Sequence, residues 1–361
     1  MDPVAPRLAD TTLALCSIAS VTGDERVIAD ELERRLSALP GVDVRRAGES
    51  VVAEIGQGPI VALFGHSDTV SPAADQPLGV DGDRLFGCGA SDMKGGLAVM
   101  LELCAEASSG EHLGVRLRCV FYDKEEGPSD ESGLIPLLDD PAPVDRDVVL
   151  ALCLEPTDNR VEAGCVGGLH ARVTVPGQRA HSARPWQGKN ALHAAADLLA
   201  ALRDRQRREV VLDGLTFYEV LSATQASTDN SRNVVPGSFV LNLNLRFAPG
   251  RPTASAIEEL RSFVDTHAPG AVVEIIDIAP SGAVRLDQPA LKKWIEAEGL
   301  LVAAKQAWTD VARLTSRGVA AVNFGPGDTA QAHQARESIS IAALLTHHGK
   351  MRALLRTVAH P

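Results

Sequence analysis

Side chains able to hold divalent metal ions recur along the whole chain, each at or near the point where an apolar run stops. They are His66, Asp68, Asp92, Glu125, Glu126, Glu155 and His333. In an open α/β sheet the carboxyl ends of the strands meet at one edge, so residues at successive strand ends can converge on one site. Two metals about 3.5–4 Å apart lower the pKa of a shared water and polarise a carbonyl group. The pattern therefore predicts a metal-dependent hydrolase of amide bonds.

The first pieces of this pattern are His66, Asp68 and Asp92. His66 and Asp68 lie two residues apart at the end of an apolar run over residues 60–64. Extended geometry places both side chains on one face, so we expect His66 to bind metal and Asp68 to orient it through a hydrogen bond. Asp92 lies in the glycine-rich segment 87–96, just before a predicted helix. Its two oxygens could bridge two metals, although the position also suits a helix N-cap.

Two adjacent acids, Glu125 and Glu126, follow a β-rich run over residues 115–122. Adjacent residues leaving a strand point to different sides. One of them can therefore ligate metal while the other faces the bound water and acts as the general base. A solvated acidic loop is the alternative, because Asp123, Asp130 and Glu131 are close in sequence.

The remaining candidates are Glu155, at the end of the apolar run 148–154, and His333, in a loop ahead of the last helix. Taken alone, each also fits an ordinary surface position. Taken together, a mixed set of imidazole and carboxylate ligands suits Zn²⁺, with Co²⁺ or Mn²⁺ as substitutes.

Composition excludes several other classes of protein. The formal net charge of −12 over 361 residues argues against nucleic acid or an anionic membrane as partner. No apolar run approaches the roughly 20 residues needed to span a bilayer, and the N-terminus lacks a signal pattern. The six cysteines show neither paired zinc-type spacing nor a dense disulfide framework. We expect a cytoplasmic protein that acts on a small molecule.

A chain of this length exceeds one ordinary core and predicts two domains. Residues 1–166 and 280–361 alternate helical and β-rich segments, which predicts an α/β domain with helices on both faces of a mixed sheet. In it, the runs 51–55 and 60–64 are expected to be neighbouring strands. Residues 167–279 follow a β-α-β-β-α-β order with one helix over 190–205, typical of a ferredoxin-like α+β domain. The helix and edge strands of this inserted domain predict a homodimer.

The motifs around these residues resemble a known family. They are Gly65-His-Ser-Asp-Thr69, Gly89-Ala-Ser-Asp-Met-Lys-Gly95, Asp123-Lys-Glu-Glu126, Gly177-Gln-Arg-Ala-His-Ser-Ala-Arg-Pro185, Asn233-Val-Val-Pro236 and Asn323-Phe-Gly-Pro-Gly327 with His333. On these motifs the chain is identified as a member of the dinuclear zinc aminoacylase and carboxypeptidase family, over nearly its whole length. The resemblance implies a zinc-peptidase-like catalytic domain, an inserted dimerisation (lid) domain and two Zn²⁺ per subunit.

The resemblance also implies a role for each matching residue. Asp92 would bridge the two metals, with a cis peptide bond to Met93. One zinc would be held by His66 and Glu155, and the other by Glu126 and His333. Glu125 would act first as general base and then as acid. His181 would stabilise the oxyanion in the partner's site, and substrate would be bound by Asn233, Arg246 and Gly325.

Within the family, the chain resembles the branch that releases succinate from N-succinyl-LL-2,6-diaminopimelate, a step of lysine and diaminopimelate biosynthesis. Deacetylation of acetylornithine or hydrolysis of dipeptides is the alternative with the same chemistry. A non-catalytic binding protein that retains the fold is an alternative of another class. Loss of Glu125 or of a metal ligand would indicate it, and all these residues are present.

Overall fold

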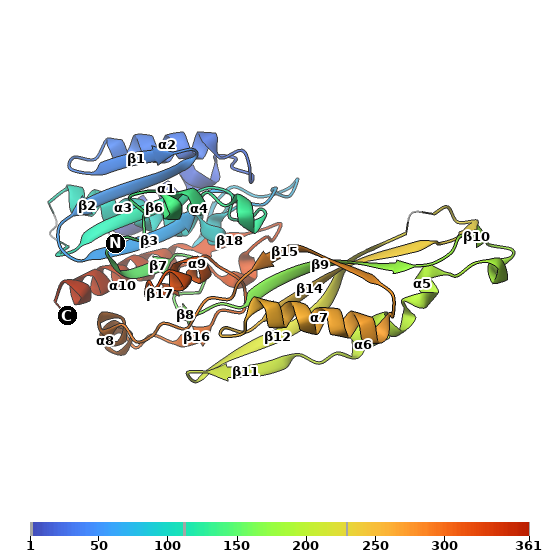
Figure 1. Ribbon diagram of the computed structural model, residues 1–361. Helices are drawn as coiled ribbons and strands as arrows, with labels where there is room; N and C mark the ends of the chain where they lie inside the picture. The colour runs from blue at the N-terminus through green and yellow to red at the C-terminus, as the bar shows by residue number, and fades with distance from the viewer. Residues whose placement is uncertain (1–2, 111–112, 229, 361) are drawn as a thin grey trace. The chain divides into compact units, whose positions relative to one another are not determined.

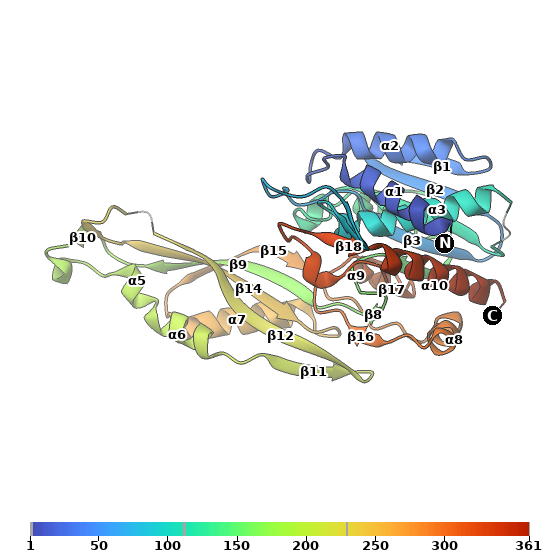
Figure 2. The ribbon, with the colours of Figure 1, turned by 180° about the vertical axis from the view of Figure 1, so that it is seen from behind.

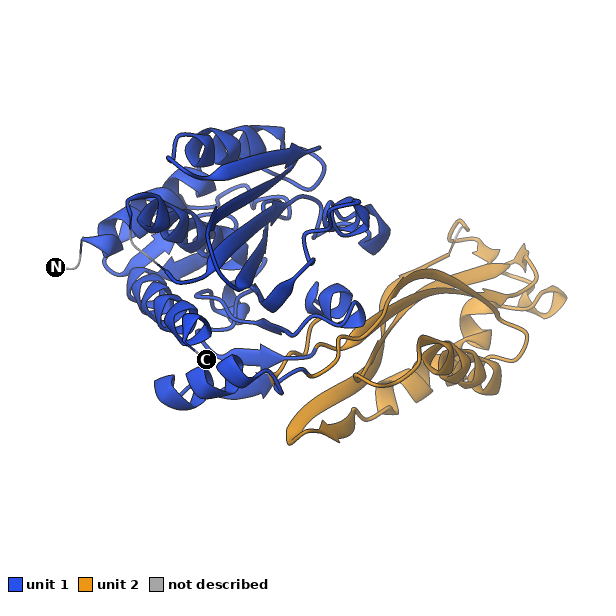
Figure 3. Ribbon diagram, turned by 60° about the vertical axis from the view of Figure 1, so that its left-hand side comes forward, with its two compact units in different colours: residues 1–164, 285–303, 309–361 blue, residues 165–284, 304–308 orange. Residues whose placement is uncertain are grey.

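The chain forms two units, which Figure 3 shows in separate colours. The computed structural model describes residues 3–110, 113–228 and 230–360. Unit 1 comprises Met1–Gly164, Arg285–Ala303 and Thr309–Pro361, and unit 2 comprises Cys165–Val284 and Ala304–Trp308. Unit 2 therefore begins two residues before the predicted inserted domain, 167–279, and continues five residues beyond it. It also takes in residues 304–308, because the Gln306 side chain bonds to the backbone of Thr216 and Tyr218.

A mixed eight-stranded sheet forms the centre of unit 1, in the order β1-β2-β6-β3-β7-β17-β8-β16. Its strands are β1 (Asp43–Ala47), β2 (Ser50–Gly56), β3 (Ile60–His66), β6 (Arg116–Tyr122), β7 (Val148–Cys153), β8 (Val161–Ala163), β16 (Val302–Ala304) and β17 (Ala321–Asn323). The strand β3 pairs in parallel with both β6 and β7. The carboxyl ends of these three strands therefore meet at one edge of the sheet.

The prediction that β2 and β3 are neighbouring strands was wrong, because β6 lies between them. The intervening turn packs against another segment: a Cβ at Gly56, where φ is +89°, would lie 2.5 Å from the Val115 carbonyl oxygen. Every residue of β3 is buried. Parallel pairing with β6 and β7 covers both edges of this apolar strand.

Helices cover both faces of this sheet, which confirms the predicted fold class (Figures 1 and 2). They are α1 (Val4–Cys16), α2 (Arg26–Ser37), α3 (Gly95–Ser108), α4 (Leu134–Asp139), α8 (Pro289–Glu298), α9 (Val311–Ser316) and α10 (Ile341–Ala359). On one face α3 packs so closely that a Cβ at Gly65 would lie 2.5 Å from Leu97 Cδ2. On the other face Phe64 and Tyr122 pack with Leu134 of α4 and Leu314 of α9. The first helix, α1, was not predicted.

The sheet of unit 2 has the order β11-β12-β14-β9-β15. Its strands are β9 (Gly167–Pro176), β11 (Arg208–Leu212), β12 (Leu215–Ser227), β14 (Ser238–Phe247) and β15 (Val272–Ala279), and its helices are α5 (Ala191–Ala194), α6 (Ala196–Asp204) and α7 (Thr253–His267). The order β12-β14-β9-β15 is that of a ferredoxin-like fold, to which β11 adds an edge strand. The helix predicted over 190–205 is divided at Ala195, where ψ of −2° departs from α-helical geometry.

Two smaller sheets complete the fold. In unit 1, β18 (Ser338–Ser340), β5 (Arg84–Phe86) and β4 (Gly79–Asp81) form three antiparallel strands. In unit 2, β10 (Ala180–His181) pairs with β13 (Val234–Val235). Within the described ranges, no helix is both long and apolar enough to cross a bilayer.

A buried histidine of α10 gives unit 1 a built-in sensitivity to acid. His347 is fully buried and stacks on Phe324 at 4.6 Å between ring centroids. Its Nδ1 lies 2.9 Å from Asn159 Oδ1, so the neutral imidazole donates there. Burial, followed by the charges of His348 and Lys350, lowers the pKa of His347 from 6.5 to about 3.

Because the folded-state pKa is below the unfolded one, protonation favours unfolding. The stability due to neutral His347 is complete above pH 6.5 and is lost as the pH falls towards 3. The full loss is roughly 5 kcal/mol at one 1.36 kcal/mol step per pKa unit. We therefore expect the free energy of unfolding, measured in urea, to fall less between pH 7 and pH 4 in the His347→Gln variant than in the wild-type protein. The exposed His193→Gln variant should keep the wild-type slope, and equal slopes for all three proteins would contradict the assignment.

Candidate metal centre

Three parallel strands of unit 1 bring their terminal side chains to one edge of the sheet. His66 is the last residue of β3, Glu125 and Glu126 lie just beyond β6, and Glu155 lies just beyond β7. His66 and Glu155 are buried, and both acids after β6 are partly exposed. The pairing β6-β3-β7 therefore places imidazole and carboxylate groups from three distant segments of the chain side by side.

Asp92 lies between two histidines that are far apart in sequence. It lies in the turn Ala90–Lys94, where its own backbone angles (φ −124°, ψ 90°) are not helical, and its peptide bond to Met93 is cis, as the family resemblance implies. Asp92 Oδ1 lies 3.1 Å from His66 Nε2, and Asp92 Oδ2 lies 4.0 Å from His333 Nε2. One carboxylate thus presents a different oxygen to each imidazole.

His333 comes to the site from a loop that other contacts hold in place. Its φ is 61°, and its Nε2 lies 2.7 Å from Glu126 Oε1. The preceding loop is tied down by the Thr329 hydroxyl, which donates to the Pro156 carbonyl, and by the Ser91 hydroxyl, which donates to the Asp328 carbonyl. The loop therefore connects the segment after β7 to the turn that carries Asp92.

The side chains fit a pair of divalent metals that share Asp92. The first set is His66, Asp92 and Glu155, and the second is Asp92, Glu126 and His333; within each, the ligand atoms lie within 4.8 Å of one another. A third combination joins His66 with Glu125 and Glu126. Imidazole nitrogen and carboxylate oxygen are the donors that zinc takes in catalytic sites. The predicted ligands thus come together as two sets with one shared member.

Asp68 does more than the sequence suggested. Its carboxylate lies 3.5 Å from His66 Nδ1, while the closer partner of that nitrogen, at 3.0 Å, is the Asp68 backbone carbonyl. The two carboxylate oxygens each accept a backbone N–H at 3.0 Å, from Glu125 and from Glu126. Asp68 therefore orients the two acids after β6 as well as His66.

Electrostatics set Glu125 apart from the other acids. Burial, followed by the charge of Glu155, raises the pKa of Glu125 well above its ordinary value, and His66 opposes this only in part. A carboxylate whose pKa is raised accepts a proton more readily than an ordinary one, and can return it later. This is the property that a general base and acid requires.

Protons compete with metal for the two histidines. Burial lowers the pKa of His66, but hydrogen bonds to Asp68 and Asp92 more than offset this and raise it well above 6.5. The hydrogen bond to Glu126 is the main cause that raises the pKa of His333. Because a ligand must lose its proton before it binds, metal affinity should fall steeply in mildly acidic solution.

Sequence reasoning missed Glu337, which holds the turn of Asp92. Glu337 is buried. One of its oxygens accepts the N–H groups of Ser91 and Asp92 at 2.8 and 2.9 Å, and the other accepts that of Gly89 at 2.8 Å. Its position four residues after His333 is the only local signal, and an acid there also reads as a surface residue.

We expect Glu337→Gln to weaken metal binding about 10- to 100-fold, the usual effect of losing a group that orients a ligand. The amide cannot accept all three N–H groups, so Asp92 is held less firmly. Competition with a zinc-binding dye would measure the dissociation constant, and saturating zinc should restore most of the activity. Glu298→Gln, at an exposed position, is the control, and an unchanged dissociation constant in Glu337→Gln would count against this role.

Three other candidates, His181, Asn233 and Arg246, belong to unit 2. His181 pairs with Val234 across β10 and β13, and Ser182 N–H donates to the Asn233 carbonyl at 3.0 Å. The fold of unit 2 therefore brings His181 and Asn233 together, both exposed. Arg246 lies opposite Gly168 on β9, and a Cβ at Gly168 would lie 2.9 Å from its guanidinium. The glycine thus leaves room for the Arg246 side chain.

Gly325, expected to bind substrate, has a clear packing role within unit 1. Its N–H donates to Thr157 Oγ1 at 3.0 Å and its carbonyl accepts from Asn159 N–H at 3.0 Å. A Cβ here would lie 2.3 Å from the carbonyl oxygens of Leu154 and Glu155. The contact with substrate stays a prediction, and the close approach to the backbone of Glu155 already explains the glycine.

Residues 62–357 match peptidase family M20/M25/M40, and the chain belongs to this family. It is thus a hydrolase of linear amide bonds, as the motifs predict. The chain is 37% identical over 337 residues to a succinyl-diaminopimelate desuccinylase of Corynebacterium glutamicum, with 91% of each chain covered. It is 39% identical over 336 residues to a provisionally named succinyl-diaminopimelate desuccinylase of Mycobacterium tuberculosis, with 92% of this chain and 93% of that one covered.

Solved structures of the family share the fold. A tripeptidase of Staphylococcus aureus superposes with a TM-score of 0.81 at 20% identity over 99% of both chains. A metallo-carboxypeptidase of Sulfolobus solfataricus superposes with a TM-score of 0.77 at 16% identity, covering 99% of this chain and 100% of that one. At these identities the likeness concerns the fold, and the substrate has to be argued separately.

Proposed function

We propose that this protein is a metal-dependent succinyl-diaminopimelate desuccinylase, which hydrolyses N-succinyl-LL-2,6-diaminopimelate to succinate and LL-2,6-diaminopimelate. The two desuccinylase relatives, at 37% and 39% identity over more than nine-tenths of the chain, support the substrate. The single observation that carries the chemistry is Asp92, whose two oxygens face His66 and His333 separately. Such a reaction belongs to diaminopimelate and lysine biosynthesis in the cytoplasm, and the six free thiols are compatible with that reducing compartment.

The proposed metal is zinc, two ions per subunit, with cobalt as a substitute. His66 and Glu155 would hold one ion, Glu126 and His333 the other, and Asp92 both. When bound, the pair supplies Lewis-acid polarisation of the amide carbonyl and a water acidic enough to attack near neutral pH.

Glu125 is proposed to move the proton. Its carboxylate takes a proton from the attacking water as the oxygen adds to the succinyl carbonyl carbon. It returns that proton to the amide nitrogen as the C–N bond breaks, and the second proton of the water passes from the new carboxyl group to the released amine. Diaminopimelate therefore leaves with that nitrogen as an ammonium group and succinate leaves as the carboxylate. The raised pKa of Glu125 favours the protonated state between these two steps.

His181 is proposed to stabilise the oxyanion that forms on the carbonyl oxygen. Its Nδ1 accepts the backbone N–H of Ala183 at 3.1 Å, so the proton of the neutral ring lies on Nε2. The Nε2–H is then a donor directed away from the backbone, which is what an oxyanion requires. Asn233, its neighbour, is proposed to bind polar groups of the substrate.

Arg246 is proposed to bind a substrate carboxylate. A planar guanidinium makes two parallel hydrogen bonds to a carboxylate. Arg246 is partly buried on the face of the unit 2 sheet that carries His170 and Asn244, and burial lowers its pKa. A partly desolvated guanidinium gains more from a carboxylate partner than an exposed one does.

The deciding experiment compares zinc-loaded protein on N-succinyl-LL-2,6-diaminopimelate, N-acetylornithine and a set of dipeptides, with a chelated control. We expect kcat/KM to be highest for the succinylated substrate and to vanish on chelation. A higher kcat/KM for N-acetylornithine or a dipeptide would change the substrate and keep the chemistry. If zinc binding is verified and none of these substrates is hydrolysed, the result would support the non-catalytic alternative.

A homodimer through unit 2 is also proposed. The strand β11 covers β12 only from Leu215 to Glu219, so the outer edge of β12 beyond this point has no partner strand within the described chain. Exposed strand edges favour pairing with a second chain. If His181 acts in the partner's site, mixing His181→Ala and Glu125→Gln chains should produce dimers with more activity than either variant alone. No recovery in confirmed mixed dimers would place His181 in its own subunit's site.

A further inference from the structure

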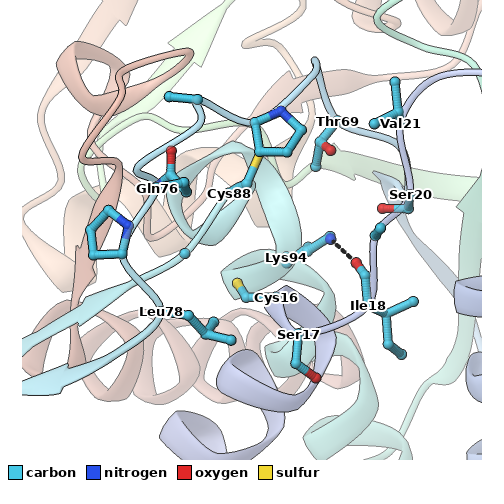
Figure 4. A pocket seen from close by; sticks show the side chains of 15 residues that line it. Cys16, Ser17, Ile18, Ser20, Val21, Thr69, Gln76, Leu78, Cys88 and Lys94 are labelled. Carbon is cyan, nitrogen blue, oxygen red and sulfur yellow. Dashed lines mark hydrogen bonds between the residues drawn. The ribbon is translucent and has the colours of Figure 1, made fainter.

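A cavity of about 290 Å³ lies in unit 1, and its lining includes none of the metal ligands named above (Figure 4). Three segments contribute to its lining: residues 16–21 at the end of α1, residues 69–78 after β3, and residues 87–94 before α3. Two of them begin or end close to metal ligands, since Thr69 follows Asp68 and Lys94 comes two residues after Asp92. The cavity is thus a separate space beside the metal centre.

The charged group of this cavity is Lys94, whose side chain is only 1% exposed. Its Nζ donates to the Ile18 carbonyl at 2.9 Å (Figure 4). A Cβ at Gly89 would lie 3.1 Å from Lys94 Cδ, so the glycine lets the aliphatic stem lie against the backbone. An ammonium group has three N–H donors. Among the described residues, the ammonium of Lys94 donates to one neutral carbonyl group.

The nearest acids do not neutralise Lys94 by direct contact. Asp68 and Glu337 act on its charge only at longer range, and no ion pair to Lys94 is found among the described residues. The oxygens of both acids accept backbone N–H groups in the turns that they hold. A buried cation without a hydrogen-bonded anion is costly, so the cavity favours a negatively charged occupant.

A second donor without a partner belongs to a residue in the wall of the same cavity, on the loop after β3. The Nε2 atom of Gln76 is buried and has no hydrogen-bond partner within the described residues, and Gln76 lines the cavity. Much of the remaining lining is apolar and includes Ile18, Val21 and Leu78. A few polar groups set in an apolar lining are typical of a small-molecule site.

We propose that this cavity binds a small carboxylate with a short apolar stem. The carboxylate accepts hydrogen bonds from Lys94 Nζ and Gln76 Nε2, and the stem packs against Ile18 and Leu78. A water molecule could accept the same hydrogen bonds but would leave the charge of Lys94 uncompensated. A phosphate dianion would need more donors and a second cation, and the lining contains one cationic side chain, Lys94. One carboxylate matches one ammonium and one amide.

The test uses the whole protein freed of metal by chelation, so that a carboxylate cannot bind to the metals instead. Cys88 lines the cavity and is partly exposed, so an occupant should slow its alkylation by iodoacetamide. With butyrate at ten times its dissociation constant, we expect the rate to fall about tenfold, since only the empty protein reacts. Butyramide, which has the same shape and no charge, and sodium chloride at equal ionic strength should leave the rate unchanged.

Two variants make the test specific. Lys94→Gln removes the cation, and Gln76→Glu introduces a negative charge from a partly exposed loop; each should abolish the protection by butyrate. Gln206→Glu, at an exposed position outside the cavity, should retain it. Equal slowing by butyrate and butyramide, no slowing at all, or full protection in Gln76→Glu would overturn the proposal. The Gln76 variant decides alone if Lys94→Gln does not fold.

Discussion

Replacing Glu125 with glutamine is expected to lower kcat on N-succinyl-LL-2,6-diaminopimelate by about 10⁴-fold, the upper range for general acid–base catalysis. The amide has nearly the same shape as the carboxylate but cannot accept the proton of the attacking water. The backbone N–H of Glu125, which donates to Asp68, is unchanged, so the loop should keep its geometry. Metal content, measured by atomic emission after dialysis, should stay at the wild-type level, and KM should change little.

The matched control is Glu131→Gln, which alters an exposed acid a few residues further along. It should keep wild-type kcat and metal content. If Glu125→Gln retained more than about one-hundredth of the wild-type kcat, proton transfer by Glu125 would contribute less than this chemistry requires. If it lost metal, its role would be that of a ligand, in the combination with His66 and Glu126.

Replacing Asp92 with alanine is expected to remove both metals, whereas replacing His333 with alanine should remove only one. Asp92 faces His66 through one oxygen and His333 through the other, at 3.1 and 4.0 Å from the respective Nε2 atoms. His333 belongs only to the set that it forms with Asp92 and Glu126. Because metals supply several kcal/mol of transition-state stabilisation, activity in the Asp92 variant should fall by more than about 10³-fold.

Metal stoichiometry after equilibrium dialysis against zinc measures this difference directly. Asp130→Ala, which removes an exposed acid, should leave the stoichiometry unchanged. An Asp92→Ala protein that still bound as much zinc as His333→Ala would show that the two ligand sets do not depend on the shared carboxylate. The circular dichroism spectrum of the variant should match the wild type, since Asp92 contributes no hydrophobic contact to the core.

Several parts of this fold could be predicted from local patterns. The helix α8, the strand β14 and the ferredoxin-like order of unit 2 follow from the spacing of apolar residues, because each buries one face along a regular period. The placement of β6 between β2 and β3 could not be predicted. That placement depends on β6, a segment some 50 residues further along, which pairs with one edge of β3. The short turn between β2 and β3 suggested a hairpin instead.

The candidate metal ligands were visible in the sequence because polar residues at the ends of apolar runs are unusual. Glu337 and Lys94 were not singled out, because their roles depend on contacts with residues distant in sequence. Glu337 accepts N–H groups some 245 residues away, and Lys94 donates to a carbonyl 76 residues away. Neither separation leaves any local pattern.

The sequence by itself determined the residue types of the site, the ends of the strands that present them and the family to which the chain belongs. These follow from local rules, since apolar periodicity specifies where a strand stops and side-chain chemistry specifies which metals suit it. The tertiary structure alone decided that Asp92 divides its oxygens between two histidines and that Asp68 and Glu337 hold the ligand loops. It also decided that Lys94 is buried beside a cavity. Such facts depend on distances between remote segments, and those distances arise only when the sheet assembles and buries both of its faces.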